Sequence, residues 1–299
     1  MTAAPALLQG GAPVALEGEA LRWVRAIDAW TVWMRAAGLR PRTVELRRYQ
    51  LGHLAEADLR RSPWSVKHGD LLAWLDGQDW SPETRKSYRA ALRSFYGWAQ
   101  QAGHSRRNPA AGLPPVRVPR GAPRPTPERV LEQAIARAPD RTRLVLVLAA
   151  YAGLRRAEIA ALRWDDIDDG VIRVRGKGGH VRHVPIHGRV AQQLEACRAR
   201  RYAGRFGTGW RYTSHPDSPF VFPGRYGRGV GADNIGRVAA AALGDYGGHT
   251  LRHRFAGRAY AATRDLGVVQ QLLGHASPNT TAVYARADRA AMADAVRAL

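Results

Sequence analysis

Residues 171–186 read Val-Ile-Arg-Val-Arg-Gly-Lys-Gly-Gly-His-Val-Arg-His-Val-Pro-Ile, and here the hydrophobic period of the chain changes from helical to extended. Alternating apolar and polar residues flank a glycine-rich turn, which predicts a β-hairpin of two short strands with Lys177 at its tip. Helical patterns surround this hairpin, from about residue 127 to 163 and again toward the C-terminus. The sequence therefore predicts a mainly α-helical fold with a small β-sheet.

The N-terminal part of the chain, from about residue 17 to 103, has the pattern of four helical segments. The first has apolar residues at the three- and four-residue spacing of an amphipathic helix: Trp23, Ile27, Trp30 and Met34. Other segments are expected to start near Pro41, Val66 and Ser81, the last with a serine cap followed by proline. These residues predict a separate helical domain.

A proline-rich and basic stretch, residues 108–127, follows this helical part. It is poor in apolar residues and too rich in proline for a helix, which is typical of an extended interdomain linker. The predicted organisation is thus a disordered N-terminus over residues 1–16, a helical domain over 17–107, the linker, and a second domain over 128–299.

The charge of the chain points to a polyanionic partner. There are 46 Lys and Arg against 25 Asp and Glu, a formal net charge of +21, and the basic residues are spread from Arg22 to Arg297. This distribution favours a groove around double-stranded DNA over a membrane surface. No apolar run is long enough to span a bilayer and no signal peptide is recognisable, so a soluble, cytoplasmic protein is expected. The single cysteine, Cys197, excludes an internal disulfide and a cysteine-rich zinc cluster.

Several basic residues are candidates for contact with DNA. Three arginines recur at four-residue intervals along one helix flank, and a solvated helix face would show the same stripe, but the net charge favours DNA contact. The linker arginines are open to the same two interpretations. The expected DNA-contacting residues are Arg42, Arg85, Arg89, Arg93, Arg117, Arg120 and Lys177.

The segment from residue 249 to residue 299 contains a set of side chains suited to phosphodiester chemistry. His249, Arg252 and His253 lie at positions i, i+3 and i+4, and His275 follows a Leu-Gly pair nine residues before Tyr284. A tyrosine hydroxyl has an ordinary pKa of about 10, so it is an effective nucleophile only where cations and donors hold a phosphate in front of it. The histidines and the arginine are such groups.

A second arginine, Arg155, follows a Gly-Leu pair at the expected start of a helix that also contains Glu158. Two arginines can neutralise both non-bridging oxygens of a phosphate, because each guanidinium forms two parallel hydrogen bonds. Taken alone, this arginine is more simply a surface residue paired with an acid. A metal site on the histidines is disfavoured, because no run of Asp, Glu or Cys completes a coordination sphere.

Five separated motifs together resemble the tyrosine recombinases, the family of phage integrases, Xer proteins and Cre: Gly-Leu-Arg155, Gly-Lys177-Gly, His249-x-x-Arg252-His253, Leu-Gly-His275 and Tyr284. The resemblance covers essentially the whole chain. It implies a helical N-terminal core-binding (SAM-like) domain and an α+β catalytic domain. It further implies that Tyr284 attacks the scissile phosphate in a pocket formed by Arg155, Lys177, His249, Arg252 and His275.

The resemblance also implies a role for each of these residues. The two arginines would stabilise the charge on the phosphorane oxygens, and Lys177 would be the general acid for the leaving 5′-oxygen. His249 would accept or share the tyrosine proton, while His275 would hydrogen-bond a phosphate oxygen. His253 would orient the motif and Glu158 would support Arg155. Neither a metal nor another cofactor is expected.

The expected partner is double-stranded DNA carrying a specific recombination site, cleaved through a 3′-phosphotyrosyl intermediate. Residues 285–299 would form an exchange helix that closes a homotetramer on DNA, with a possible accessory DNA-bending protein. The region before residue 17 is too short for a separate arm-site domain, and a phage or mobile-element integrase is the preferred role. The alternatives are an Xer-like resolvase of chromosome or plasmid dimers, a type IB topoisomerase-like enzyme, and a DNA-binding regulator with a recombinase fold.

Overall fold

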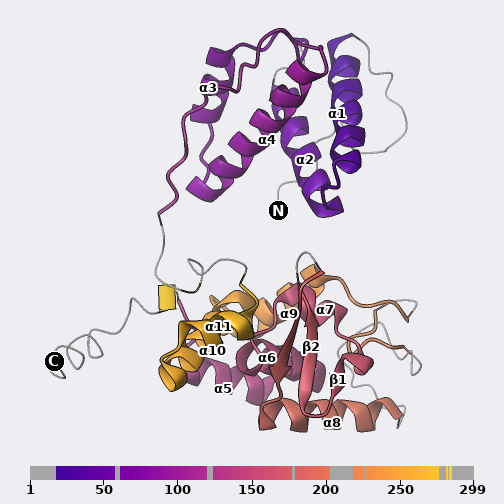
Figure 1. Cartoon of the computed structure of the whole chain (residues 1–299), viewed down its shortest axis with the longest axis vertical. Coiled ribbons are helices and arrows are strands. Elements are labelled where there is room, and N and C mark those ends of the chain that lie inside the picture. The colour runs from indigo at the N-terminus through magenta and orange to yellow at the C-terminus, as the bar shows by residue number, and fades with distance from the viewer. Residues whose placement is uncertain are drawn as a thin grey trace, which may run out of the picture. The chain divides into compact units, whose positions relative to one another are not determined.

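The computed structural model divides into two compact units, Met1–Arg120 and Gly121–Leu299, and each is described by itself (Figure 1). The side chains of residues 200–202 are not described. The described residues are 18–57, 61–119, 124–176, 179–202, 218–224, 227–275, 281 and 283–284. Within them, no helix combines the length and the apolar character that crossing a bilayer requires.

The described part of the first unit contains the expected helical segments. They are α1 (Glu19–Ala36), α2 (Pro41–Ala57), α3 (His68–Asp76) and α4 (Pro82–Gln101). Helix α4 begins as expected, because Pro82 is its first residue and the Ser81 hydroxyl accepts a hydrogen bond from the Thr84 N–H at 3.3 Å. The core of the unit is aromatic, with Trp30 and Phe95 in edge contact at 5.3 Å between ring centroids.

The start of the expected linker belongs to this unit. Ala110 and Leu113 are buried in its core, and the Arg89 guanidinium donates two hydrogen bonds to the Leu113 carbonyl, at 2.7 and 3.0 Å. The first residues of the predicted linker, residues 108–127, therefore pack against the first unit, and the bounds of the linker stay a prediction. The two buried apolar side chains and the hydrogen bonds from Arg89 hold this segment against the unit.

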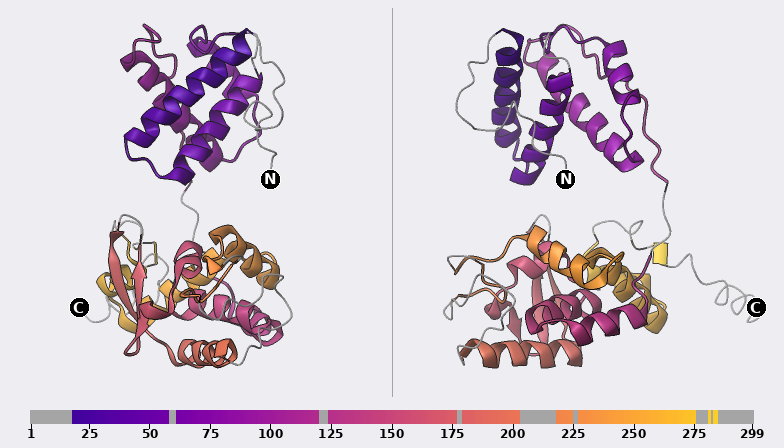
Figure 2. Two further views of the ribbon diagram at one scale, coloured as in Figure 1. Left: turned by 90° about the vertical axis from the view of Figure 1, so that its right-hand side faces the viewer. Right: turned by 180° about the vertical axis from the view of Figure 1, so that it is seen from behind.

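In the second unit, further helices and a small sheet lie around one buried helix, α6 (Figure 2). Helix α6 packs against α5, α8, α9 and α10. The helices are α5 (Glu128–Arg137), α6 (Asp140–Tyr151), α7 (Arg156–Ala161), the 3-10 helix η2 (Trp164–Asp166), α8 (Gly188–Tyr202), α9 (Ala232–Leu243), α10 (Gly248–Thr263) and α11 (Leu266–Leu273).

The sheet is antiparallel with the order β1-β2-β3, formed by β1 (Ile167–Asp168), β2 (Val171–Arg175) and β3 (Val181–Pro185). The predicted hairpin is confirmed, and its register pairs Ile172 with Val184, both buried. Strand β1 was not predicted, because two residues are too few to show an alternating pattern.

In the second unit, a glycine with positive φ follows helix α6 and another follows helix α11. Gly153 follows α6 with φ of 63°, and a Cβ built there would lie 2.4 Å from the Phe255 ring, so only glycine fits. Gly274 ends α11 in the left-handed conformation with φ of 61°. His275 therefore follows a helix end, as the sequence predicted.

Candidate active site

The turn after α6 and the start of α7 position the first arginine. Arg155 is the N-cap residue of α7, and its backbone N–H donates to the Glu158 carboxylate at 2.8 Å. The Arg155 side chain bonds the other oxygen of the same carboxylate, also at 2.8 Å. The Glu158 carboxylate thus holds both the backbone N–H and the side chain of Arg155. This is the supporting role that was expected for Glu158.

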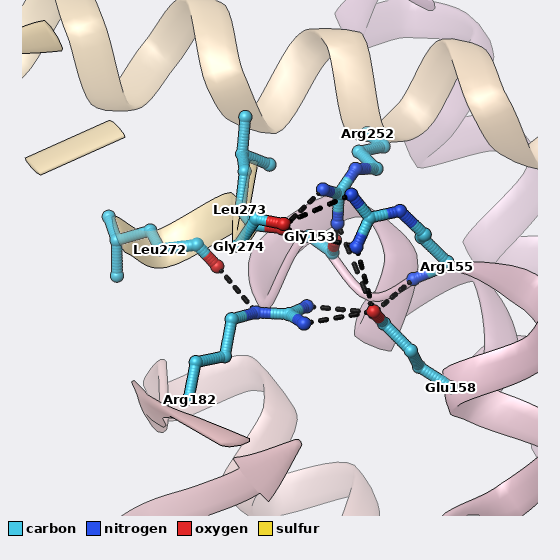
Figure 3. A network of polar contacts seen from close by, with 8 residues as sticks. All are labelled: Gly153, Arg155, Glu158, Arg182, Arg252, Leu272, Leu273 and Gly274. Carbon is cyan, nitrogen blue, oxygen red and sulfur yellow. Dashed lines mark hydrogen bonds and ion pairs between the residues drawn. The ribbon is translucent and has the colours of Figure 1, made fainter. Parts of the chain in front are cut away.

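Glu158 is the centre of a network of arginines (Figure 3). Its side chain is 5% exposed and accepts two hydrogen bonds from Arg182 of β3, at 2.7 and 2.9 Å. Arg252 of α10 lies 4.0 Å from the same carboxylate. Burial raises the pKa of Glu158, but Arg182 and Arg155 outweigh this effect and hold the pKa below its usual value.

Backbone carbonyls at the end of α11 hold the same arginines. The Leu273 carbonyl accepts from Arg252 at 2.5 Å and from Arg155 at 3.2 Å, and the Leu272 carbonyl accepts from Arg182 at 2.9 Å. Helix C-termini carry partial negative charge, which favours cations there. These contacts bring together residues from α7, β3, α10 and α11 that are far apart in the sequence.

The described part of this network has an excess of positive charge. Arg252 is 3% exposed, and burial followed by repulsion from Arg155 lowers its pKa to about 9, so the guanidinium stays charged at neutral pH. Three guanidiniums face one carboxylate, which leaves a formal charge of about +2. Such an arrangement is suited to bind an anion with several oxygens, such as a phosphate diester.

Tyr284 lies in a small apolar cluster with Ala256, Val269 and Leu273, and it is 9% exposed. Its hydroxyl is 2.7 Å from Nδ1 of His253. Burial raises the pKa of this hydroxyl, with a smaller opposing effect from Arg252. The hydroxyl is therefore neutral at pH 7, and its use as a nucleophile requires a proton acceptor.

The histidine beside Tyr284 is not the one expected. His249 was expected to accept or share the tyrosine proton and His253 to orient the motif, but the hydrogen bond to the Tyr284 hydroxyl is made by His253. The two rings are in edge contact at 4.5 Å between centroids. Because they lie one helical turn apart on the same face of α10, the sequence alone did not determine which one meets the tyrosine.

The histidines of the pocket are neutral. Burial, followed by neighbouring groups of which His249 comes first, lowers the pKa of His253 to about 4, and burial followed by Arg252 lowers that of His275 to about 4. The pKa of His249 is lowered for the same kind of reason, burial and then Arg252. His275 Nδ1 lies 2.9 Å from the Thr281 hydroxyl. These rings are thus hydrogen-bond partners or proton acceptors rather than cations.

The structure brings Arg155, His249, Arg252, His275 and Tyr284 of the predicted set into one region of the second unit. Lys177 lies outside the described residues, between the ends of β2 and β3 in the sequence. Arg120 and the expected exchange helix, residues 285–299, also lie outside them. Among the residues that the structure does describe, no group of three or more His, Cys, Asp or Glu is arranged to hold a metal.

The arginine stripe of α4 has partners within its own unit. Arg85 donates to the carbonyls of Leu75 at 2.9 Å and Gln78 at 3.0 Å, and Arg93 donates to the Ala111 carbonyl at 2.5 Å. Together with the contact from Arg89 to Leu113, these bonds join α4 to neighbouring segments. Contact of these arginines with DNA stays a prediction.

The remaining candidates for DNA contact lie at the surface. Arg42 forms an exposed ion pair with Glu45 at 3.5 Å, one turn along α2, and Arg117 is exposed. Contact of Arg42 and Arg117 with DNA also stays a prediction.

Arg182 was not among the residues predicted from the sequence. A signal for it exists in β3, where Val184 faces the core and Arg182, two residues before it, must face the same side. A charged residue at an inward position of a strand requires a partner of opposite charge. The sequence did not show that this partner is Glu158, because the two residues are 24 positions apart.

Comparison with known proteins identifies the family. The model of the phage integrase family matches residues 126–291, which is more than half of the chain. The chain belongs to this family of tyrosine recombinases. Its members transfer DNA strands, which confirms the enzyme class expected from the sequence.

Curated relatives extend the similarity to most of the chain. The tyrosine recombinase XerC of Chromobacterium violaceum is 31% identical over 280 residues, covering 88% of this chain and 90% of the relative. XerC of Xylella fastidiosa (strain M23) is 35% identical over 213 residues, covering 67% of this chain and 68% of the relative.

Solved structures share the fold. A lambda integrase dimer bound to a COC′ core site has a TM-score of 0.68 at 20% identity, covering 89% of this chain and 77% of that one. The XerH site-specific recombinase bound to a palindromic difH substrate has a TM-score of 0.66 at 18% identity, covering 95% of this chain and 89% of that one. These likenesses confirm the predicted fold class, helical with a small sheet.

Proposed function

We propose that this protein is a site-specific recombinase that cleaves and rejoins double-stranded DNA through a covalent 3′-phosphotyrosyl intermediate at Tyr284. The observation that carries the proposal is the 2.7 Å contact between the Tyr284 hydroxyl and His253, in a unit where three guanidiniums face one carboxylate. A neutral proton acceptor lies against the nucleophile, and the nearby charge is suited to hold a phosphate.

In the proposed reaction, the Tyr284 oxygen attacks phosphorus, its proton passes to His253, and the bond to the 5′-oxygen breaks. Arg155 and Arg252 stabilise the charge that develops on the phosphorane oxygens, an effect worth about 2.7–4 kcal/mol for each donor in comparable sites. Lys177 protonates the leaving 5′-oxygen, because an alkoxide is a poor leaving group. The 5′-hydroxyl of a second strand then displaces the tyrosine, so each bond that breaks is matched by one that forms.

The similarity to XerC proteins over most of the chain supports an Xer-like role, the resolution of chromosome or plasmid dimers, over the integrase role that the sequence analysis preferred. A phage or mobile-element integrase is the second candidate, supported by the shared fold with lambda integrase. Deleting the gene distinguishes them. Loss of a resolvase leaves dimers that accumulate, whereas loss of an integrase leaves the host chromosome monomeric and blocks insertion of the element.

The proposed assembly is a homotetramer on two copies of a specific DNA site in the cytoplasm, closed by residues 285–299 and helped by an accessory DNA-bending protein. The structures of DNA-bound recombinases with the same fold support DNA as the partner. Deletion of residues 288–299 should leave binding to a half-site nearly intact and severely reduce synapsis. Full recombination by the truncated protein would contradict this assembly.

A nicked suicide substrate tests the chemistry. Tyr284→Phe should bind DNA with almost unchanged affinity and form no covalent adduct, because one hydroxyl is removed. Tyr260→Phe, which changes a tyrosine of α10 that packs against the same apolar cluster, is the matched control and should retain the adduct. An adduct formed by Tyr284→Phe would refute the proposal. Wild-type cleavage should also survive excess EDTA. If EDTA abolished cleavage and added magnesium restored it, the protein would belong to the metal-dependent nucleases.

A further inference from the structure

Helix α10 has a second face with tertiary contacts, beside the face that carries residues of the candidate site. His249 and His253 lie on the first face, one turn apart. On the adjacent face, Thr250, Arg254 and Arg258 recur at four-residue intervals, and all of them contact one short segment, residues 126–128. In the chain, this segment is the end of the linker and the beginning of α5. We call residues 126–128 the linker clamp.

The first contact of the linker clamp is a chain of hydroxyl groups. Thr126 is 2% exposed, and its Oγ1 lies 2.6 Å from Oγ1 of Thr250. The Thr250 hydroxyl donates its proton to the Gly247 carbonyl at 2.7 Å, so the Thr126 hydroxyl must be the donor to Thr250. The Thr126 backbone N–H also donates to the Thr250 carbonyl, at 3.3 Å. These bonds hold the first turn of α10, which contains His249 and Arg252.

The second contact is ionic and lies one turn further along α10. Glu128 accepts hydrogen bonds from Arg254 at 2.8 and 3.0 Å and from the exposed Arg258 at 3.1 Å. Burial raises the pKa of Glu128, but Arg254 and Arg258 outweigh it and lower the pKa overall, so the carboxylate is charged at neutral pH. A buried guanidinium held by a carboxylate has a well-defined position, because each bond restricts its planar group.

Arg254 extends the clamp to the other half of the site. Its side chain, 5% exposed, donates to the Ala150 carbonyl at 3.0 Å and lies over the Tyr151 ring at 4.9 Å. Ala150 and Tyr151 end α6, and the Gly153 turn that follows leads directly to Arg155. Arg254 therefore joins the linker clamp, the helix that carries Arg252 and His253, and the turn that carries Arg155.

We propose that Thr126 and Glu128 are positioning residues, which fix the rotation and the axial position of α10 so that His253 meets Tyr284 and Arg252 lies beside Arg155. This inference rests on the proposed function. The hydrogen bonds described above join the clamp to Thr250, Arg254 and Arg258, and the clamp acts on the site through Thr250 and Arg254. A displacement of about 1 Å in such a site can reduce a rate about 100-fold, so the loss of one clamping bond should be measurable in the chemical step.

Two substitutions at Thr126 separate its hydroxyl from its shape. Thr126→Val keeps the volume and removes the donor, whereas Thr126→Ser keeps the donor and removes a methyl group. In full-length protein, we expect Thr126→Val to lower the single-turnover rate of adduct formation on a nicked substrate at least about tenfold, with half-site affinity unchanged. Thr126→Ser should retain most of the rate.

A matched pair on α5 tests the ionic contact. Glu128→Gln removes the carboxylate that Arg254 and Arg258 share. Glu132→Gln removes the same charge one turn later, where the side chain contacts Arg189 and Tyr151 but not α10. We expect a lower cleavage rate at equal half-site affinity for Glu128→Gln only. Because Glu128→Gln can fail to fold, Arg258→Ala, which removes only the exposed partner, is the second variant and should lower the rate less.

Hydrogen exchange of the α10 backbone gives a readout that needs no activity. Thr126→Val should speed exchange across residues 250–258 at 25 °C, while exchange of the α6 amides stays unchanged. An unchanged cleavage rate in Thr126→Val with unchanged α10 exchange would overturn the inference. So would a rate in Thr126→Ser as low as in Thr126→Val, since packing rather than the hydroxyl would then be responsible.

The failure of this inference is distinguishable from failure of the proposed function. If wild-type protein forms no adduct through Tyr284, the proposed function is wrong, and the exchange measurement still decides whether the clamp holds α10. The second case is that wild-type protein forms the adduct, but the lower cleavage rate of a clamp variant is fully explained by its lower folded fraction at the assay temperature. The clamp is then only structural, and the positioning role is refuted.

Discussion

Two groups of arginines in this chain have the same chemistry and opposite surroundings. In the second unit, Arg155, Arg182 and Arg252 converge on the buried carboxylate of Glu158. In the first unit, the stripe along α4 donates to backbone carbonyls and is spread over the outside of one helix. Converging guanidiniums create a local excess of positive charge, whereas arginines separated by a turn each bond their own backbone carbonyls. The residue type alone therefore does not identify an anion-binding site.

The largest effect should follow from removing the carboxylate at which the first group meets. Glu158→Gln leaves buried guanidiniums without their counter-charge, and breaking a buried ion pair in this way costs about 3–5 kcal/mol of stability. Thermal or denaturant unfolding of the variant measures this cost.

Asp166→Asn is the control for Glu158→Gln, because Asp166 is also buried and pairs with two arginines outside the pocket. It should destabilise the protein while the folded fraction keeps its cleavage rate. A Glu158→Gln variant as stable as wild type would show that the carboxylate does not balance the arginine cluster.

The next largest effect concerns catalysis. Arg155→Ala should reduce the rate of adduct formation about 10²–10³-fold with little change in half-site affinity, because the guanidinium is proposed to stabilise developing charge. Arg156→Ala is the matched control. Arg156 is the next residue in the chain, and its side chain forms an exposed ion pair with Asp233 outside the network. Equal rates for the two variants would contradict the role of Arg155.

A smaller effect is expected in the α4 stripe. Arg89→Ala removes two hydrogen bonds from the Leu113 carbonyl and should cost about 1–3 kcal/mol of unfolding free energy. If Arg89 also contacts a phosphate, as the sequence predicted, the slope of log affinity against log salt should become smaller by about one unit. An unchanged slope would leave this arginine with a structural role alone and would sharpen the contrast between the two groups.

The smallest effect should be a pH dependence confined to the second unit. The pKa of His253 and of His275 is about 4 in the folded protein and about 6.5 when unfolded, so between these values the unfolded chain binds more protons. Stability from these groups is complete above pH 6.5 and declines as the pH falls toward 4. Both rings are partly exposed, so the midpoint of thermal unfolding should change by only a few degrees.

Calorimetry of a His253→Gln, His275→Gln double variant measures this contribution. Wild-type protein should lose more stability than the variant between pH 7 and pH 5, since the variant lacks both titrating rings. Parallel curves over that range would show that the two histidines are not held neutral by the fold.

Much of the fold was predictable because it depends on local patterns. The helical spacing around Trp23 and Trp30, the serine cap before Pro82 and the alternation on both sides of Gly176 are properties of neighbouring residues, and the helices and the hairpin follow them. Strand β1 and the packing of Ala110 and Leu113 were missed, because a two-residue strand and two isolated buried side chains leave no periodic signal.

The sequence also predicted a set of reactive side chains, since the types and spacings of Arg155, Arg252 and Tyr284 resemble one family, and this set stays a prediction. The partners of these residues were decided only by the tertiary structure. Whether His249 or His253 meets the tyrosine depends on the rotation of α10, and the roles of Arg182 and Thr126 depend on contacts over 24 and 124 positions of sequence. The physical reason is that hydrogen bonds act over about 3 Å, so which groups form them is fixed only when distant segments pack together.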